Sequence, residues 1–250
     1  MSICQNNKKL RVENIKKDFK NTSVIDDVSF YVKENEFVSI LGPSGSGKST
    51  IFNIISGLLK PDSGKIEVNG ENYTGKVGHV SYMYQKDLLL PWKKIIDNTA
   101  MPLILKGEKK EAARKKAAKY FKNFGLEGFE EKYPHQLSGG MRQRAALLRT
   151  YMFSKDIMLL DEPFGALDAI TRSKMHFWLL DVIKNLNSTV LFITHDIEEA
   201  IFLSDRIYIL SDKPAKIKDE IEVKLENRNN KDVVTSKEFN DIKRRILNAL

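Results

Sequence analysis

The sequence has a single cysteine in 250 residues and no long hydrophobic run. One thiol, Cys4, cannot form a disulfide within the chain, and it agrees with a reducing, cytoplasmic environment. No apolar stretch approaches the roughly 18 residues that a membrane-spanning helix needs. Residues 1–9 are polar and basic, without the apolar segment of a secretory signal. We therefore expect neither a disulfide-stabilised secreted domain nor an integral membrane protein.

Histidine and proline are also scarce, with 4 and 7 residues. His79, His135 and His176 lack the spacing of metal ligands, so we expect no metal site formed by the protein alone. The net charge of +8 would suit nucleic acid or an anionic membrane surface. The lysines are scattered along the chain, however, which favours an ordinary solvated surface. The length and the 42% hydrophobic content predict one large or two small globular domains.

Residues 42–50 read GPSGSGKST and match the phosphate-binding pattern G-x-x-x-x-G-K-[ST]. An apolar run at 36–41 predicts a buried strand before this loop, and 48–56 predict a helix after it. Glycines let the backbone wrap around a phosphate, and the N–H groups of the helix start face the anion. Lys48 supplies positive charge for the phosphates, and the Ser49 hydroxyl can bind Mg²⁺. A turn without a ligand is the alternative, but it leaves the Lys-Ser pair unexplained, so we expect a bound nucleoside triphosphate.

Two acids, Asp161 and Glu162, end a second apolar run that begins at Ile157. Carboxylates at the end of a buried strand are costly unless they meet a cation or a partner. We expect Asp161 to hold Mg²⁺, and Glu162, on the opposite side of the strand, to polarise the attacking water. A solvated strand end is the alternative. His195 follows a third apolar run and could donate to a γ-phosphate oxygen, although a lone histidine is more often structural.

Residues 137–143 read LSGGMRQ and predict a second anion-binding helix start. Ser138 is a good N-cap, and the two glycines after it permit close backbone approach. We expect a helix from Met141 onward. One nucleotide does not obviously need two such helix starts.

The order of predicted elements indicates an α/β fold. Strands are predicted at 10–15, 28–32, 36–41, 65–68 and 79–84, with a turn at 21–27. A mainly helical stretch follows and includes a helix at 108–124 that stops at Gly125. Further strands at 156–160, 189–193 and 206–210 alternate with a helix at 172–186, which implies a parallel sheet covered on both faces. A last helix is expected from Ser236.

Taken together, these motifs resemble the nucleotide-binding subunit of an ATP-binding cassette (ABC) transporter. The matched motifs, in the order of the family, are Walker A (42–50), Q-loop (Gln85), signature (137–141), Walker B (157–162), D-loop (165–168) and switch histidine (His195). Phe19, which we expect to be exposed, falls where the family carries an aromatic that stacks on adenine; an ordinary surface or core Phe is the alternative. Met141 stands where many family members have Gln, and we expect no loss of activity from it.

The resemblance implies a phosphate-loop NTPase core with a mostly parallel sheet, an antiparallel β subdomain and a helical subdomain, in one ABC ATPase domain. The implied parts are the core with the β subdomain at 8–85 and 152–215, the helical subdomain at 86–151 and a C-terminal tail at 216–250. The implied site residues are Lys48, Gln85, Glu162 and His195 for catalysis; Phe19, Gly42, Pro43, Ser44, Gly45, Ser46, Gly47, Lys48, Ser49, Thr50, Ser138, Gly139, Gly140 and Asp168 for ATP; and Ser49, Gln85 and Asp161 for Mg²⁺.

The resemblance also implies partners and a location. Two copies of the chain would form a head-to-tail dimer that sandwiches two ATP molecules, each between the phosphate loop of one copy and the signature residues 138–140 of the other. The dimer would lie on the cytoplasmic face of the membrane and drive a permease, with an extracytoplasmic solute-binding protein as an indirect partner and no nucleic acid. Residues 85–92 (QKDLLLPW) and 190–200 (VLFITHDIEEA) resemble the importers of nitrate, sulfonates, taurine and thiamine-pyrimidine precursors.

Three other functions compete with that of an importer ATPase. A soluble cassette ATPase that acts on DNA or ribosomes usually carries a coiled-coil insertion or two cassettes, and this chain has neither. An exporter ATPase is the second alternative, and the sequences of residues 90–92 (LPW) and 194–200 (THDIEEA) favour import over it. A small-molecule kinase would leave residues 138–140 unexplained.

Overall fold

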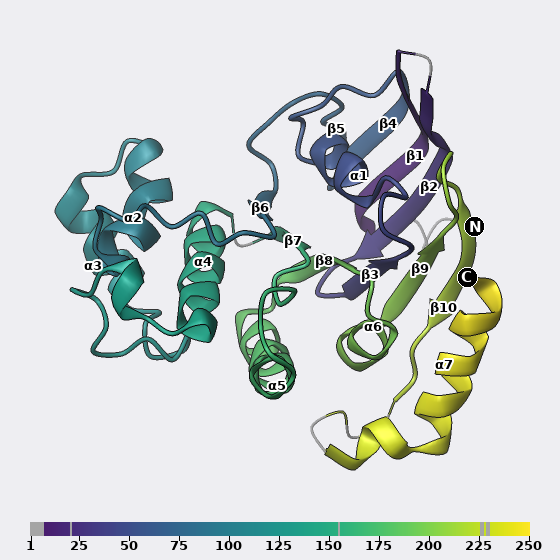
Figure 1. Cartoon of the computed structure of the whole chain (residues 1–250). Coiled ribbons are helices and arrows are strands. Elements are labelled where there is room, and N and C mark those ends of the chain that lie inside the picture. Colours follow the sequence, from purple (N-terminus) through teal and green to yellow (C-terminus); the bar gives the residue numbers. More distant parts are fainter. Residues whose placement is uncertain (1–7, 21, 155, 226–227, 229–230) are drawn as a thin grey trace. The chain divides into compact units, whose positions relative to one another are not determined.

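The structure is a computed structural model, and it describes residues 8–20, 22–154, 156–225, 228 and 231–250 (Figure 1). Cys4 lies outside these residues. The chain divides into two compact units, one made of Met1–Val80 with Asn187–Leu250 and the other of Ser81–Leu186.

The first unit contains an antiparallel sheet in the strand order β2-β1-β4-β5. Its strands are β1 (Lys8–Phe19), β2 (Thr22–Lys33), β4 (Ser63–Val68) and β5 (Glu71–Asn72). Leu10, Val12 and Ile15 of β1 are buried, as the alternation of apolar residues predicts for a half-buried strand.

A mostly parallel set of strands completes the first unit, in the order β10-β9-β3-β8. Its members are β3 (Phe37–Leu41), β8 (Thr189–Thr194), β9 (Arg206–Leu210) and β10 (Ile217–Glu222). β3 is parallel to β8 and β9, and every residue of these three strands is buried, as their continuous apolar runs predict. The helices of this unit are α1 (Lys48–Ile55), α6 (Ile197–Leu203), η2 (Lys231–Thr235) and α7 (Lys237–Ala249).

The second unit combines two short parallel strands with most of the helical residues. The strands are β6 (Ser81–Met83) and β7 (Ile157–Asp161). The helices are α2 (Ile95–Leu105), α3 (Lys110–Ala118), η1 (Pro134–Gln136), α4 (Gly139–Phe153) and α5 (Ala169–Leu186). The α/β fold with mostly parallel strands and a separate antiparallel sheet is therefore confirmed (Figure 1).

Two predictions of local structure are wrong. The predicted turn at 21–27 is a strand from Thr22 onward, with Asn21 outside the described residues. The chain at Asp26 and Asp27 forms a bulge instead, because Asp27 has a φ of 62° and its carboxylate accepts a hydrogen bond from the Asn14 side chain at 2.8 Å. The helix predicted at 108–124 ends at Ala118, and residues 119–125 continue as tight turns.

The C-terminal part contains one predicted element and one missed one. α7 is confirmed, and the hydroxyl of Ser236 caps it by accepting the N–H of Phe239 at 3.1 Å. The edge strand β10 was not predicted, because Ile221 is its one fully buried side chain and the remainder is charged or partly exposed. Among the described residues, no helix has both the length and the apolar character that crossing a bilayer requires.

Candidate functional site

The phosphate loop lies in the first unit, between β3 and α1, as predicted. Gly45 and Gly47 have φ angles of 79° and 106°, a region of backbone conformation that favours glycine. A Cβ atom on Gly47 would also lie 3.3 Å from Cγ1 of Val24, a tight contact that adds to the preference for glycine. α1 begins directly after Gly47, and no side chain caps it. Its first N–H groups therefore face the interior of the loop without competition from a side chain.

The lysine of this loop is folded over the loop's own backbone. Lys48 is 6% exposed, and its Nζ donates to the carbonyl oxygens of Gly42 and Pro43, both at 2.8 Å. The Ser46 hydroxyl is buried and has no hydrogen-bond partner among the described residues. A cation, helix N–H groups and an unsatisfied hydroxyl in one loop fit an anionic phosphate ligand.

His195 and the phosphate loop leave the same edge of the parallel strands. Leu41 at the end of β3 is paired with Thr194 at the end of β8, so Gly42 and His195 follow adjacent carboxyl ends. Ligands of open α/β sheets bind at this edge. His195 is exposed, and the backbone after it is fixed by Asp196, whose carboxylate accepts the N–H of Glu198 at 2.9 Å and begins α6.

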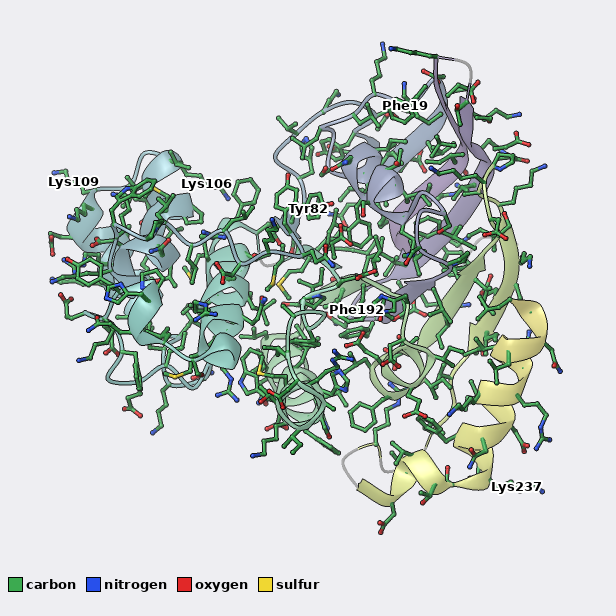
Figure 2. The ribbon with its side chains drawn as sticks, viewed as in Figure 1. Phe19, Tyr82, Lys106, Lys109, Phe192 and Lys237 are labelled. Carbon is green, nitrogen blue, oxygen red and sulfur yellow. The ribbon has the colours of Figure 1, made fainter. Side chains whose placement is uncertain are left out.

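Phe19 is the last residue of β1 and is 44% exposed, as expected (Figure 2). The ammonium group of Lys17 lies 5.6 Å from the centre of its ring. An exposed aromatic ring that faces a cation is available for stacking on a planar ligand.

The acidic strand end lies in the second unit. Asp161 is the last residue of β7 and is 8% exposed, and its carboxylate accepts a hydrogen bond from the Tyr82 hydroxyl at 3.2 Å. Burial, followed by the negative charge of Asp161, raises the pKa of Tyr82 well above its ordinary value, so Tyr82 stays a hydrogen-bond donor at neutral pH. Tyr82 was not predicted as a site residue, although it lies only three residues before Gln85.

The prediction that Glu162 continues the strand alternation is wrong. Its φ of 43° lies in the left-handed region, so the backbone turns out of the strand immediately after Asp161. The turned carboxylate meets Gln85, whose Nε2 donates to Glu162 Oε2 at 3.2 Å. The structure thus brings together two predicted site residues that are 77 positions apart. Left-handed backbone at a residue other than glycine is strained and often marks functional sites.

The second glycine-bearing helix start also lies in the second unit. Ser138 caps α4, and its hydroxyl accepts the N–H of Met141 at 3.3 Å. α4 begins at Gly139, two residues earlier than predicted. A Cβ atom on Gly140 would lie 3.3 Å from Cγ2 of Thr171, so the glycine allows the start of α5 to pack closely. Asp168 has a capping role that was not predicted, because it accepts the N–H of Thr171 at 3.0 Å.

Two arginines that were not predicted hold the segment after Gln85 against α4. Arg149 donates to the carbonyl oxygens of Asp87 at 2.5 Å and Leu88 at 2.7 Å. Arg142 pairs with the Asp87 carboxylate at 3.3 Å and donates to the carbonyl oxygen of Leu137 at 2.9 Å. Leu88 itself has a φ of 46°, so these bonds fix a strained backbone.

Each unit carries an oxygen donor that fits a Mg²⁺ ion bound together with a nucleotide. The hydroxyl of Ser49, which is exposed, and the carboxylate of Asp161 are both oxygen donors of the kind that Mg²⁺ prefers. Among the described residues, no three His, Cys, Asp or Glu side chains gather as a site that holds a metal by itself.

Comparisons with known proteins identify relatives over most of the chain. A family model described as ABC transporter matches residues 25–165. The chain is 49% identical over 194 residues to the formylaminopyrimidine import ATP-binding protein of Halalkalibacterium halodurans, which covers 78% of this chain and 76% of that protein. It is 39% identical over 231 residues to an aliphatic sulfonates import ATP-binding protein of Bacillus cereus, which covers 92% of this chain and 90% of that protein.

One of the similar solved structures is a dimeric post-hydrolysis state of an ATP-binding cassette bound to ADP and Pi. It has a TM-score of 0.73 and 32% sequence identity, and the match covers 86% of this chain and 99% of that one.

Proposed function

Because the chain belongs to the ABC transporter family, we propose that it is the ATP-hydrolysing subunit of an importer and energises the uptake of a small solute through a separate membrane permease. The import names of its relatives support import over export. They also support a solute of the sulfonate, nitrate or thiamine-pyrimidine class. The subunit lies on the cytoplasmic face of the membrane, and an extracytoplasmic binding protein delivers the solute to the permease.

One observation carries this proposal, namely that a single chain contains a complete phosphate loop at α1 and a second glycine-bearing helix start at α4. The two starts serve different nucleotides in a head-to-tail dimer. The phosphate loop of one copy binds ATP, and Ser138, Gly139 and Gly140 of the other copy close over its γ-phosphate. The dimeric cassette structure with 32% identity supports this arrangement. Asp168 lies at the same dimer interface.

The phosphate loop holds the triphosphate. On binding, the Nζ of Lys48 exchanges its bonds to the Gly42 and Pro43 carbonyls for phosphate oxygens. Mg²⁺ would be held by Ser49, Asp161 and Gln85, and it would neutralise charge on the phosphates. Tyr82 keeps the Asp161 carboxylate oriented. Phe19 stacks on the adenine ring.

Hydrolysis needs a water molecule in line with the γ-phosphate. Glu162 polarises that water, and the Gln85 amide fixes the Glu162 side chain until the site closes. His195 donates to a γ-phosphate oxygen and so responds to the presence of that group. Turnover therefore depends mainly on positioning and on stabilisation of charge.

The second unit provides the contact to the permease. Residues 86–151 form the helical subdomain, and Leu88 and Trp92 at its start are 53% and 71% exposed. Large apolar side chains that are this exposed suit a protein partner. Residues 8–85 and 152–215 form the nucleotide-binding core with the antiparallel β subdomain, and 216–250 form a tail.

Light scattering on Glu162→Gln, with and without ATP, tests the proposal. The substitution keeps the shape of the side chain but removes the carboxylate, so bound ATP is trapped and the monomer becomes a dimer only when ATP is present. Glu127→Gln, at an exposed glutamate of the same unit, should dimerise and hydrolyse ATP like the parent protein. Normal ATP hydrolysis by Glu162→Gln would contradict the role of Glu162, and a monomer in both conditions would mean that the permease is needed to bring the two copies together.

A further inference from the structure

The end of β1 that carries Phe19 lies beside the phosphate loop. Phe19 is paired with Thr22 at the tip of the β1–β2 hairpin, and Val24 follows two residues later on β2. A Cβ atom on Gly47 would lie 3.3 Å from the side chain of Val24, so the hairpin packs directly on the loop. Both elements belong to the first unit. A nucleotide whose phosphates lie in the loop can therefore reach the exposed ring of Phe19 with its base.

The hairpin tip extends past the neighbouring strand. β4 begins at Ser63, which is paired with Lys16, so the last residues of β1 have no strand partner on that side. A backbone N–H without a partner weakens the fixation of a strand end. The position of Phe19 thus depends on the groups that bind residues 17 and 18 in place of a β4 strand.

Asp62 takes that place. Its carboxylate accepts the N–H of Asp18 at 2.7 Å and the ammonium group of Lys17 at 2.6 Å. Its own N–H donates to the carbonyl oxygen of Lys16 at 3.0 Å. These three bonds hold every residue of β1 that lies between the end of the β4 pairing and Phe19. The bond from Asp18 and the charge of Lys17 also keep the pKa of Asp62 below its ordinary value, so the carboxylate is ionised at neutral pH.

We infer that Asp62 is a positioning residue for nucleotide binding, which fixes the Phe19 ring where the adenine base stacks. This inference rests on the proposed function, because it takes the base to stack on Phe19. Asp62 lies in the turn that follows α1, so it connects the helix of the phosphate loop with the aromatic ring. Lys17, which pairs with Asp62, also faces the Phe19 ring and adds to its fixation.

Calorimetric titration with ADP and with inorganic pyrophosphate separates this role from a general structural one. Both ligands occupy the phosphate loop and neither is hydrolysed by the site, but only ADP carries a base. Stacking of a base on an aromatic side chain is worth enough that Phe19→Ala should weaken ADP binding by roughly 5-fold or more. Asp62→Ala should weaken ADP binding roughly 3-fold or more, by freeing the ring. Neither variant should change pyrophosphate binding.

The double variant gives the sharper test. If Asp62 acts through Phe19, Asp62→Ala should weaken ADP binding no further once Phe19→Ala is present. Glu67→Ala is the matched control, because Glu67 lies in the same sheet and pairs with Arg11 at 3.8 Å, away from the hairpin tip. Glu67→Ala should bind ADP and pyrophosphate with the affinities of the parent protein. Asp62→Asn keeps one oxygen that can accept the Asp18 N–H. Its affinity for ADP should therefore lie between that of the parent protein and that of Asp62→Ala.

Three outcomes would overturn the inference. An equal loss of ADP and pyrophosphate binding in Asp62→Ala would make Asp62 a structural residue of the whole site. Additive losses in the double variant would mean that Asp62 does not act through Phe19. A Phe19→Ala variant with unchanged ADP affinity would refute base stacking on Phe19, and with it this inference, while leaving ATP hydrolysis by the chain untouched.

Discussion

The two glycine-bearing helix starts of this chain are built in different ways. At α1 the glycine before the helix has a φ of 106°, no side chain caps the helix, and Lys48 is buried against the loop. At α4 the cap is Ser138, with ordinary extended backbone and a hydroxyl that takes up the N–H of Met141. At α1 the first helix N–H groups and the Lys48 ammonium group are directed into the phosphate loop. At α4 the Ser138 hydroxyl accepts one helix N–H group, and Ser138 is exposed to solvent.

This difference indicates what each start can bind alone. A loop whose glycines adopt positive φ angles and whose Ser46 hydroxyl is unsatisfied gains stability when an anion fills it. A helix start that is already capped is stable without a ligand and suits a ligand that another molecule presents. The contrast agrees with the proposed dimer, in which the first start holds the nucleotide and the second closes on it.

The largest effect is expected from Lys48→Ala. Removing the buried cation from the phosphate loop should weaken ATP binding by about 100-fold or more, because charge-assisted bonds to phosphate are lost. Equilibrium titration with ATP measures this change. Lys119→Ala, at an exposed lysine of the second unit, serves as the control and should bind ATP normally. An unchanged affinity of Lys48→Ala would count against the phosphate-loop assignment.

Ser138→Arg should separate binding from turnover. The added side chain blocks the second helix start, so ATP hydrolysis should fall about 10-fold or more, while ATP binding to the monomer stays within about 2-fold. Steady-state hydrolysis and titration on the same preparation measure the two quantities. Ser173→Arg, at an exposed serine of α5, is the control and should change neither the rate of ATP hydrolysis nor the affinity for ATP. Normal turnover of Ser138→Arg would remove the case for a shared site.

A third prediction compares the same substitution, glycine to alanine, at the two helix starts. Gly47→Ala should lower the free energy of unfolding by about 2 kcal/mol, because alanine is strained at a φ of 106° and its Cβ meets Val24. Gly139→Ala should change it by less than about 1 kcal/mol, because that glycine has ordinary helical space with Leu167 at 3.4 Å. Urea denaturation measures both. Equal losses would show that the two starts do not differ in backbone strain.

Local patterns in the sequence predicted the features that depend on neighbouring residues. The strand, glycine loop and helix at 36–56 lie close together in the chain, and their order alone predicts the phosphate loop. The caps of α4 and α7 were equally predictable, because Ser138 and Ser236 act on N–H groups three residues away.

Features that join distant residues were not predictable. The contact between Gln85 and Glu162 depends on the left-handed backbone of Glu162. A glutamate in the sequence does not predict this conformation. The bonds from Arg149 to backbone carbonyls likewise require the packing of α4 against a loop 61 residues earlier. The turn prediction at 21–27 failed for the same reason, since Asp26 and Asp27 have turn chemistry but bind partners across strands.

The two arginines on α4 have a mechanical consequence. Arg142 and Arg149 attach the segment at Asp87 and Leu88 to points near the start and toward the end of one uninterrupted helix. A straight helix of 15 residues is a rod of about 22 Å that hardly bends. We therefore expect a displacement of the exposed Leu88 to move α4, and with it Ser138, as one rigid piece. The segment needs no refolding to transmit it.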